Sequence, residues 1–338
     1  MPSIFARRCL PLGSIVASFL AVSALPLPSQ APPAESATPQ MRLVRTVDPA
    51  SLRLSDRDRL SGGLPHLVPF RIASDKQGRI LITDPRLSVI QVLDVEAGKR
   101  YQLKSGAAPK MVFPTYIALD DDDDLYVSDP VLGVVLEFFP DGRFARSIGG
   151  DELALPFGLA VDKAGRRLFV VDHQRAAVVV YSLEGKFLKS IGSLGTAAGE
   201  LVHPTDIAYE HGVLYVLDVG NARFEAFDAE GKFKAVLPFG NSRLPLAFTA
   251  DKDGRLYCVD GLSLGVLVLD PAGNSVATYG ARRDYGQPSP ADNFPTYTGL
   301  TLRGDGAVLG LRPDLAVDVL EFQPGSQGAG RAPKPEKE

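Results

Sequence analysis

The chain has 338 residues, of which 45% are hydrophobic and 22% charged, and its formal net charge is −4. This composition is typical of a globular protein and not of a disordered or membrane protein, and the near-neutral charge gives no electrostatic reason to expect a nucleic-acid partner. The 33 Gly and 27 Pro, with few runs long enough for helices, favour many short strands joined by turns.

The N-terminal segment has the features of an export signal. Two arginines precede an apolar stretch over residues 10–27, and the small residues Ser23 and Ala24 offer a cleavage site. We therefore expect a signal peptide over 1–24, a linker over 25–40 and an exported protein, periplasmic or extracellular, with no stable membrane span after cleavage. An uncleaved membrane anchor is the alternative, although Pro and Gly interrupt the apolar stretch.

One pattern then recurs along the chain. Each copy has a proline, an apolar strand, a polar turn and a second strand that ends in Asp, followed by two more strands. Successive copies are separated by 45, 42, 48 and 41 residues, which is the length of a four-stranded propeller blade. Five copies are clear, and they begin at Pro69, Pro114, Pro156, Pro204 and Pro245.

A sixth copy is incomplete. Residues 299–322 supply three strands, but a Pro- and Gly-containing flexible tail over 323–338 follows where a fourth strand is needed. The segment 43–47, LVRTV, has apolar, basic and hydroxyl residues in the same order as the fourth strand at 187–191, FLKSI. We therefore predict an all-β, six-bladed β-propeller of four-stranded blades over 41–322, with the ring closed by an N-terminal strand that completes the last blade.

The pattern of a proline, Ile/Leu/Val-Ala, an acidic turn, Leu-Tyr-Val-x-Asp and an aromatic-rich third strand resembles the NHL-repeat family of propellers. The copy that begins at Pro204 is the best match, because Asp218, Gly220, Asn221 and Arg223 all fit the family pattern. The resemblance covers the whole repeat region and implies the propeller architecture. It does not imply one function, because this fold carries unrelated activities.

Two acidic features resemble cation sites, but turns account for both. An Asp ends the second strand of five copies, beside a tight turn in which its side chain can accept backbone N–H groups. The run Asp120–Asp124 occupies the turn that reads DKQG, DKAG or DKDG in other copies, so we interpret it as a solvated turn and not as a calcium site. The strand-ending residues are Asp84, Asp129, Asp172, Asp218 and Asp260.

The histidines do not define a catalytic centre. A catalytic zinc site usually needs three protein ligands, and His66, His173 and His203 fall on loops of three different blades, with His211 on the opposite face. The amidating-lyase propellers, which this fold resembles, use a histidine-bound zinc, but their ligands cannot be mapped onto this chain. No Ser/His/Asp arrangement for nucleophilic catalysis stands out in the sequence, and no glycine-rich loop is followed by the Lys and Ser/Thr of a phosphate-binding loop. We therefore predict no catalytic residue, no metal and no cofactor.

Long loops provide the best candidate binding site. Residues 48–68 and 280–294 flank the sixth blade on the face where each fourth strand connects to the next blade, and a third long loop spans 192–203. Arg offers a fork for carboxylates or phosphates and Tyr offers a stacking surface, although ordinary solvated loops are the alternative interpretation. The predicted ligand-binding residues are Arg57, Arg59, His66, Arg282, Arg283, Asp284, Tyr285 and Tyr297.

The leading functional hypothesis is an exported, non-enzymatic binding or interaction scaffold that presents this loop face to a protein, peptide or glycan partner, with no nucleic-acid partner. The alternative is a metal-assisted propeller enzyme, either a lyase or a lactonase-like hydrolase. An enzyme is expected to gather carboxylates or histidines around the central channel, whereas a scaffold is expected to show a broad surface without such convergence.

Overall fold

The computed structural model of the protein describes residues 39–54, 70–103, 110–240, 245–261, 265–280 and 297–324. Every described residue belongs to one compact unit, residues 36–338. Among these residues, no helix is both long enough and apolar enough to cross a membrane.

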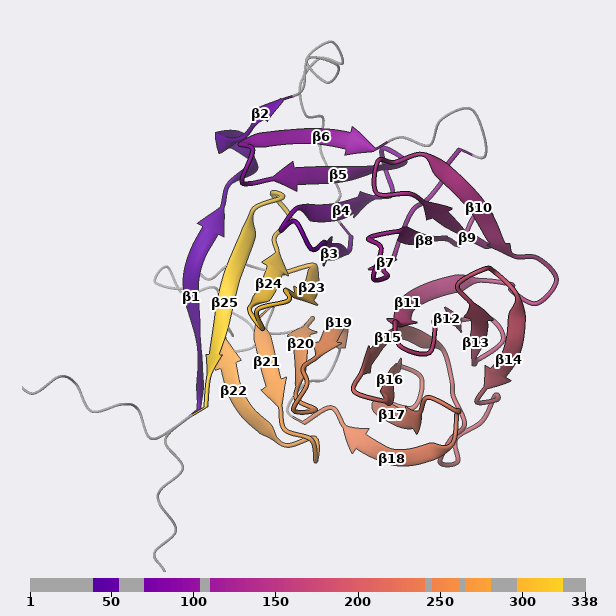
Figure 1. The fold of residues 1–338 in the computed structure, drawn as a ribbon. Coiled ribbons are helices and arrows are strands. Elements are labelled where there is room, and N and C mark those ends of the chain that lie inside the picture. Colours follow the sequence, from indigo (N-terminus) through magenta and orange to yellow (C-terminus); the bar gives the residue numbers. More distant parts are fainter. Residues whose placement is uncertain are drawn as a thin grey trace, which may run out of the picture. The chain divides into compact units, whose positions relative to one another are not determined.

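The described residues form six sheets arranged around a common axis, as Figure 1 shows, and the predicted six-bladed propeller is confirmed. Blade one contains β3 (Ile72–Ser74), β4 (Ile80–Asp84), β5 (Val89–Asp94) and β6 (Lys99–Leu103). Blade two contains β7 (Ile117–Leu119), β8 (Leu125–Asp129), β9 (Val134–Phe138) and β10 (Phe144–Gly149). Blade three contains β11 (Pro156–Asp162), β12 (Arg167–Asp172), β13 (Ala177–Ser182) and β14 (Phe187–Ile191). Blade four contains β15 (Pro204–Glu210), β16 (Val213–Asp218), β17 (Arg223–Asp228) and β18 (Phe233–Pro238). Blade five contains β19 (Pro245–Ala250), β20 (Leu256–Asp260), β21 (Val266–Leu269) and β22 (Ser275–Tyr279). Blade six contains β23 (Gly299–Leu302), β24 (Val308–Leu311), β25 (Val317–Gln323) and β1 (Gln40–Val47). A short helix (Pro49–Ser51) and a short strand, β2 (Arg53–Leu54), follow β1, and β2 pairs with β6 in parallel.

Ring closure through the N-terminal strand is confirmed. β1 pairs antiparallel with β25 from Gln40 opposite Gln323 to Val47 opposite Val317, so the strand begins three residues before the predicted start at 43. The side chain of Thr46 donates a hydrogen bond to Asp318 at 2.6 Å. Most of β1 is exposed because it is the outermost strand of its blade.

In the sequence, the alternation of Leu214 and Val216 predicts a core on one face of the second strand. In the structure, both faces of each second strand are buried. In β16, Leu214 and Val216 pack against the third blade, and Tyr215 and Leu217 pack against the fifth. A blade has a neighbour on either side, so its central strands read as continuous apolar runs and not as a strict alternation. The cores of the protein therefore lie between blades.

The strand-ending aspartates have the structural role that the sequence predicts. Asp172 is fully buried and accepts hydrogen bonds from the backbone N–H of Ala154 (2.7 Å) and Arg175 (3.1 Å). One carboxylate thus joins the connection from the preceding blade to the turn between the second and third strands of its own blade. Asp129 and Asp218 accept comparable backbone hydrogen bonds. We call the face that carries these connections and turns the loop face, and the opposite face the turn face.

The acidic run also forms a turn. Asp120 accepts hydrogen bonds from the backbone N–H of Asp122 (2.9 Å) and Asp124 (3.0 Å) and from the hydroxyl of Tyr126 (3.1 Å). The first carboxylate of the run therefore stabilises the turn between β7 and β8.

Candidate functional site

Three large polar side chains meet at the axis of the propeller. They occupy the third position of their repeats, either in the innermost strand or immediately before it, and the equivalent residues of the other three blades are small. A Cβ atom at Gly158 would lie 2.8 Å from Cα of Asp206, and one at Gly299 would lie 3.1 Å from the carbonyl oxygen of Phe70. The small residues therefore leave the space that the large side chains fill. The six positions are Arg71, Tyr116, Gly158, Asp206, Ala247 and Gly299.

Arg71 connects the first blade to four others. Its Nη2 donates to the hydroxyl of Tyr116 at 2.9 Å and to the carbonyl of Leu246 at 2.8 Å, and its Nη1 donates to the carbonyl of Thr298 at 3.3 Å. Its Nε lies 3.7 Å from Oδ2 of Asp206, and the side chain is only 9% exposed. These contacts reach the second, fifth, sixth and fourth blades, so one guanidinium group ties together segments far apart in the sequence.

Asp206 is the buried counter-charge of Arg71. Its side chain is 7% exposed, Oδ1 accepts the backbone N–H of Ile207 at 2.9 Å, and Oδ2 lies 3.4 Å from the backbone nitrogen of Phe248. Burial raises the pKa of the Asp206 carboxyl to about 6, and the nearby Arg71 acts in the opposite direction. Within the described part of the chain, Nε of Arg71 has no hydrogen-bond partner.

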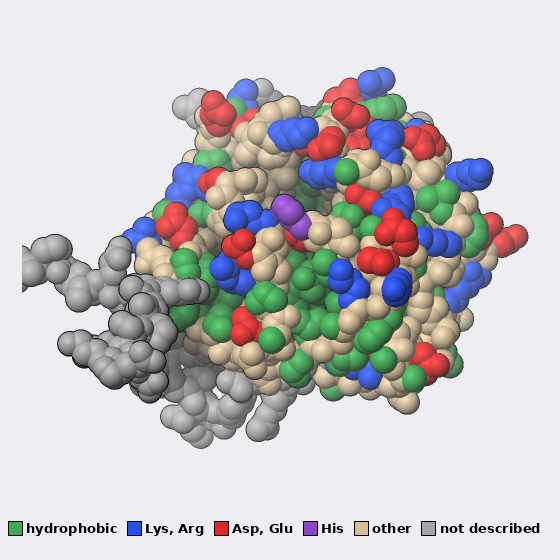
Figure 2. All heavy atoms as spheres, turned by 60° about the horizontal axis from the view of Figure 1, so that its bottom comes forward, with side chains coloured by type: hydrophobic (Ala, Val, Ile, Leu, Met, Phe, Trp, Pro, Cys, Tyr) green, Lys and Arg blue, Asp and Glu red, His purple; other side chains and the backbone are tan. Residues whose placement is uncertain are grey.

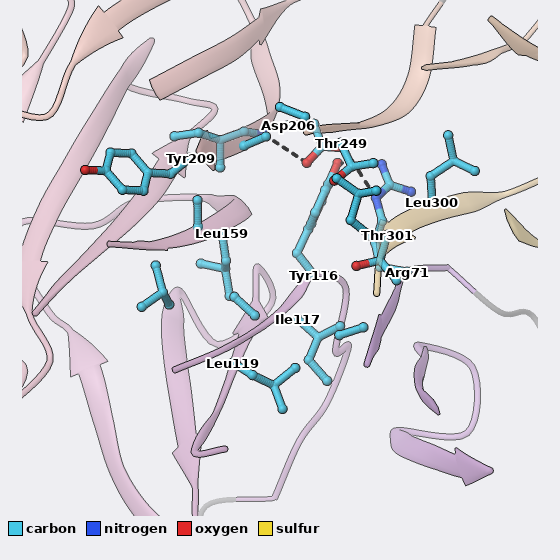
Figure 3. Close-up of a pocket in the computed structure, with 18 of the residues that line it drawn as sticks. Arg71, Tyr116, Ile117, Leu119, Leu159, Asp206, Tyr209, Thr249, Leu300 and Thr301 are labelled. Carbon is cyan, nitrogen blue, oxygen red and sulfur yellow. Dashed lines mark hydrogen bonds and ion pairs between the residues drawn. The ribbon is translucent and has the colours of Figure 1, made fainter. Parts of the chain in front are cut away.

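These groups form one end of a central cavity of about 250 Å³. Figure 3 shows Arg71, Tyr116 and Asp206 together, with Leu119 and Leu159 on the wall. The lining runs along the innermost strands of all six blades to Ser74, Lys163 and Glu210, beside the turns that join first and second strands. The cavity is therefore closed at the Arg71 end, and its mouth lies on the turn face.

The raised pKa of Asp206 makes stability depend on pH. The folded carboxyl holds its proton up to a pH of about 6, so its stabilising contribution is fully present below the unfolded pKa, near 3.8, and is lost as the pH rises through 6. Relative to Asp206→Asn, which does not titrate, the wild type is expected to lose up to roughly 3 kcal/mol of unfolding free energy between pH 4 and pH 7, since one pKa unit corresponds to about 1.4 kcal/mol. Urea denaturation of both proteins at each pH measures this difference, and parallel pH profiles would contradict it.

A row of aromatic rings extends outward from the axis along the loop face. Ring centroids are 5.6 Å apart for Phe70 and Tyr116, 6.1 Å for Tyr116 and Phe157, 4.8 Å for Phe157 and His173, and 5.2 Å for His173 and His203. His173 is oriented by a 3.0 Å contact between its Nδ1 and the carbonyl of the residue after His203. Two of the histidines that the sequence placed on one face are therefore neighbours, whereas His66 lies outside the described residues.

Exposed apolar side chains gather on the loop face of the second blade. Val112 and Phe113 are 42% and 43% exposed, and Val131 and Leu132 are 64% and 38% exposed. They belong together because Asp129 accepts the backbone N–H of Val112 (2.6 Å), Phe113 (2.9 Å) and Leu132 (3.1 Å). We call these four residues the blade-two patch.

Only one predicted ligand-binding residue lies in the described part of the chain. Tyr297 is 1% exposed, and its hydroxyl donates to Asp318 at 2.8 Å, so it is a core residue of the sixth blade. Gly310 makes room for it, because a Cβ atom there would lie 2.6 Å from the Tyr297 ring. The prediction for the two loops beside blade six stays a prediction. Its other residues, Arg57, Arg59, His66, Arg282, Arg283, Asp284 and Tyr285, lie outside the described residues.

The third long loop, 192–203, is held against the fourth blade. Arg223 donates from Nη1 to the carbonyl of Thr196 at 3.0 Å and from Nη2 to the carbonyl of Ala197 at 2.6 Å, and Asn221 donates to the carbonyl of Gly195 at 3.0 Å. The arginine and asparagine of the NHL-like pattern thus have a packing role in this blade. Leu194, within this loop, is 73% exposed.

A metal site would need several ligating side chains close together. Over the described ranges, no three His, Cys, Asp or Glu side chains are placed to hold one metal ion.

Sequence reasoning did not single out Arg71, Asp206 or the blade-two patch. The first two were accessible in principle, because aligning the repeats shows opposite charges at the third position of two copies and Gly or Ala at the same position of three others.

Comparison with known proteins places the fold. A family model described as a six-bladed β-propeller matches residues 159–265. Three solved structures are similar at low sequence identity: a catalytically inactive variant of virginiamycin B lyase from Staphylococcus aureus with quinupristin (TM-score 0.57, 11% identity, covering 75% of this chain and 95% of that one), a gluconolactonase from Xanthomonas campestris (0.57, 18%, 76% and 86%) and a chain of a nidogen/laminin complex (0.53, 20%, 64% and 81%). At these identities the likeness concerns the fold alone.

Proposed function

We propose that this six-bladed propeller is an exported, non-enzymatic scaffold of the NHL-repeat kind, and that it binds a protein or peptide partner through its loop face. The observation that carries this proposal is the blade-two patch, in which four neighbouring apolar side chains are each at least 38% exposed. Contiguous apolar surface of this kind often marks an interaction site, whereas single exposed apolar residues are ordinary. Apolar side chains on the partner are its natural complement, which favours a protein or peptide over a glycan.

The patch is also preorganised. The Asp129 carboxylate is fully buried and fixes the backbone of both segments that carry the patch, so little conformational entropy remains to be lost on binding. The aromatic row passes nearby, because its second ring belongs to Tyr116, which follows Phe113 by three residues in the same blade. A partner that covers the patch can therefore extend onto Phe70 and Phe157.

Surface charge supports the same class of partner. Figure 2 shows one side of the molecule, on which Lys and Arg side chains are interspersed with Asp and Glu, with hydrophobic side chains between them. Nucleic-acid binding surfaces are instead predominantly basic.

An enzyme is the second candidate. Lyases and a gluconolactonase are among the proteins with a similar fold, and a carboxyl with a raised pKa in a central cavity, such as Asp206, is a feature of catalytic acids and bases. It ranks second because Arg71 and Asp206 make contacts that are accounted for by joining blades, as described above.

The scaffold proposal predicts a partner on one face. A photo-crosslinking residue is introduced at Val131 on the loop face or, as the control, at Lys252, whose side chain is 72% exposed in a turn on the opposite face. In cells that make the protein naturally, irradiation is expected to give a defined adduct from position 131 and none from position 252. Mass spectrometry of the same protein reports whether residues 1–24 have been removed.

A second substitution tests whether the patch makes the contact. Adding Phe113→Asp to the position-131 protein is expected to lower the adduct yield about tenfold, because a carboxylate would have to be desolvated in an apolar contact. The melting temperature should stay unchanged, since Phe113 is 43% exposed. Equal adducts from both faces, or a yield insensitive to Phe113→Asp, would discard the loop face as the binding surface.

A further inference from the structure

The central cavity is independent of the blade-two patch, because its mouth is on the turn face. Its walls are the innermost strands of the blades, each of which is the end strand of its sheet. End strands carry backbone N–H and C=O groups without a partner strand on one side. A volume of about 250 Å³ is below that of pockets for drug-sized ligands, so an occupant must be small.

The closed end of the cavity has a polar gap. Nε of Arg71 and Oδ2 of Asp206 are 3.7 Å apart, too far for a direct hydrogen bond but close enough for one oxygen atom to bridge them. Nε of Arg71 belongs to a side chain that is 9% exposed, and it has no hydrogen-bond partner among the described residues. A buried N–H donor of this kind is costly unless an acceptor forms a hydrogen bond with it. A hydroxyl group can accept from Nε and donate to the carboxylate.

The lining is balanced in charge and mixed in polarity. Its charged members are two cations, Arg71 and Lys163, and two anions, Asp206 and Glu210. An ionic ligand would therefore meet no unpaired opposite charge. Between these groups the wall alternates apolar residues such as Leu159 and Leu300 with the hydroxyl-bearing Thr249 and Thr301, as Figure 3 shows.

We propose that this cavity binds a small, neutral, polyhydroxylated molecule, no larger than a monosaccharide, with one hydroxyl bridging Nε of Arg71 and Oδ2 of Asp206. The balanced charge selects a neutral ligand, the two threonines offer further hydroxyl contacts, and the leucines pack against C–H groups of the ligand.

Three probes of similar size and different charge test this inference: D-glucose, D-gluconate and D-glucosamine. Saturable binding of D-glucose to one site is expected by calorimetry or ligand-observed NMR, with the anion and the cation at least about tenfold weaker, the effect of roughly one lost hydrogen bond or one unpaired charge. Asp206→Asn should weaken D-glucose binding about tenfold, because the amide is a poorer acceptor than the carboxylate.

Two further substitutions locate the site. Thr301→Phe fills the cavity and should abolish D-glucose binding, whereas Thr196→Phe, the same change at an exposed residue of the loop face, should leave it unchanged. If Thr301→Phe fails to fold, the double variant Thr249→Val, Thr301→Val removes both hydroxyls with little change in volume and should weaken binding. Absence of saturable D-glucose binding, tighter binding of either charged probe, or indifference to the cavity substitutions would each overturn the proposal and leave a water-filled space.

Discussion

Deletion of residues 39–47 is expected to make the chain aggregate. β1 is the outer strand of the sixth blade, and its removal exposes the edge of β25 along all seven residues from Val317 to Gln323. An exposed strand edge is a template for pairing with other chains. The deletion also removes Met41 and Val47 from the core, where each is only 6% exposed. Size-exclusion chromatography with light scattering measures the outcome, with a large drop in melting temperature for whatever remains monomeric.

A substitution and a peptide separate loss of the strand from loss of one contact. Thr46→Val removes the 2.6 Å hydrogen bond to Asp318 but keeps the strand, so we expect a monomer destabilised by about 1–2 kcal/mol. A synthetic peptide spanning 39–48, added during refolding, should return part of the deletion protein to the monomeric fraction. A deletion protein that is soluble, monomeric and unchanged in melting temperature would show that β1 is dispensable for closure.

The fold was largely predictable because the blade is a local unit that repeats. Each copy carries its own turns and its own strand-ending Asp, and the closing strand was recognised because LVRTV resembles the fourth strands of other blades. Features that depend on contacts between blades were not predicted from the sequence. β2 pairs in parallel with β6 through only two residues, which leaves no periodic signal, and the burial of both faces of β16 requires a blade on either side.

The candidate site was less predictable, because long-range packing forms it. Arg71, Tyr116 and Asp206 come from three repeats and meet only when the ring closes, and Arg71 also contacts carbonyls more than 170 positions away in the sequence. The exposure of Val131 could not be inferred either, since an apolar residue in a turn has no periodicity to indicate which way it points. Tyr297 was placed beside a binding loop by its position in the chain, and its burial follows from Gly310 on the adjacent strand.

Arg71→Met is expected to cost about 3–5 kcal/mol of unfolding free energy at pH 8, the range found when one partner of a buried ion pair is removed. The substitution keeps most of the side-chain volume but deletes the bonds to Tyr116, Leu246 and Thr298 and leaves the Asp206 carboxylate without its counter-charge. At pH 5 the loss should be smaller, because a proton neutralises Asp206. The chain has no Trp, so urea unfolding is followed by circular dichroism.

The double variant Arg71→Met, Asp206→Asn identifies how much of this loss comes from the unpaired charge. If the buried carboxylate dominates, the double variant should recover at least about half of the stability lost by Arg71→Met at pH 8, and its stability should no longer depend on pH in this range. If the loss instead reflects the missing hydrogen bonds between blades, the two variants will be equally unstable at both pH values. That result would show that Arg71 stabilises the axis through hydrogen bonds between blades and that the Arg71–Asp206 charge pair does not contribute.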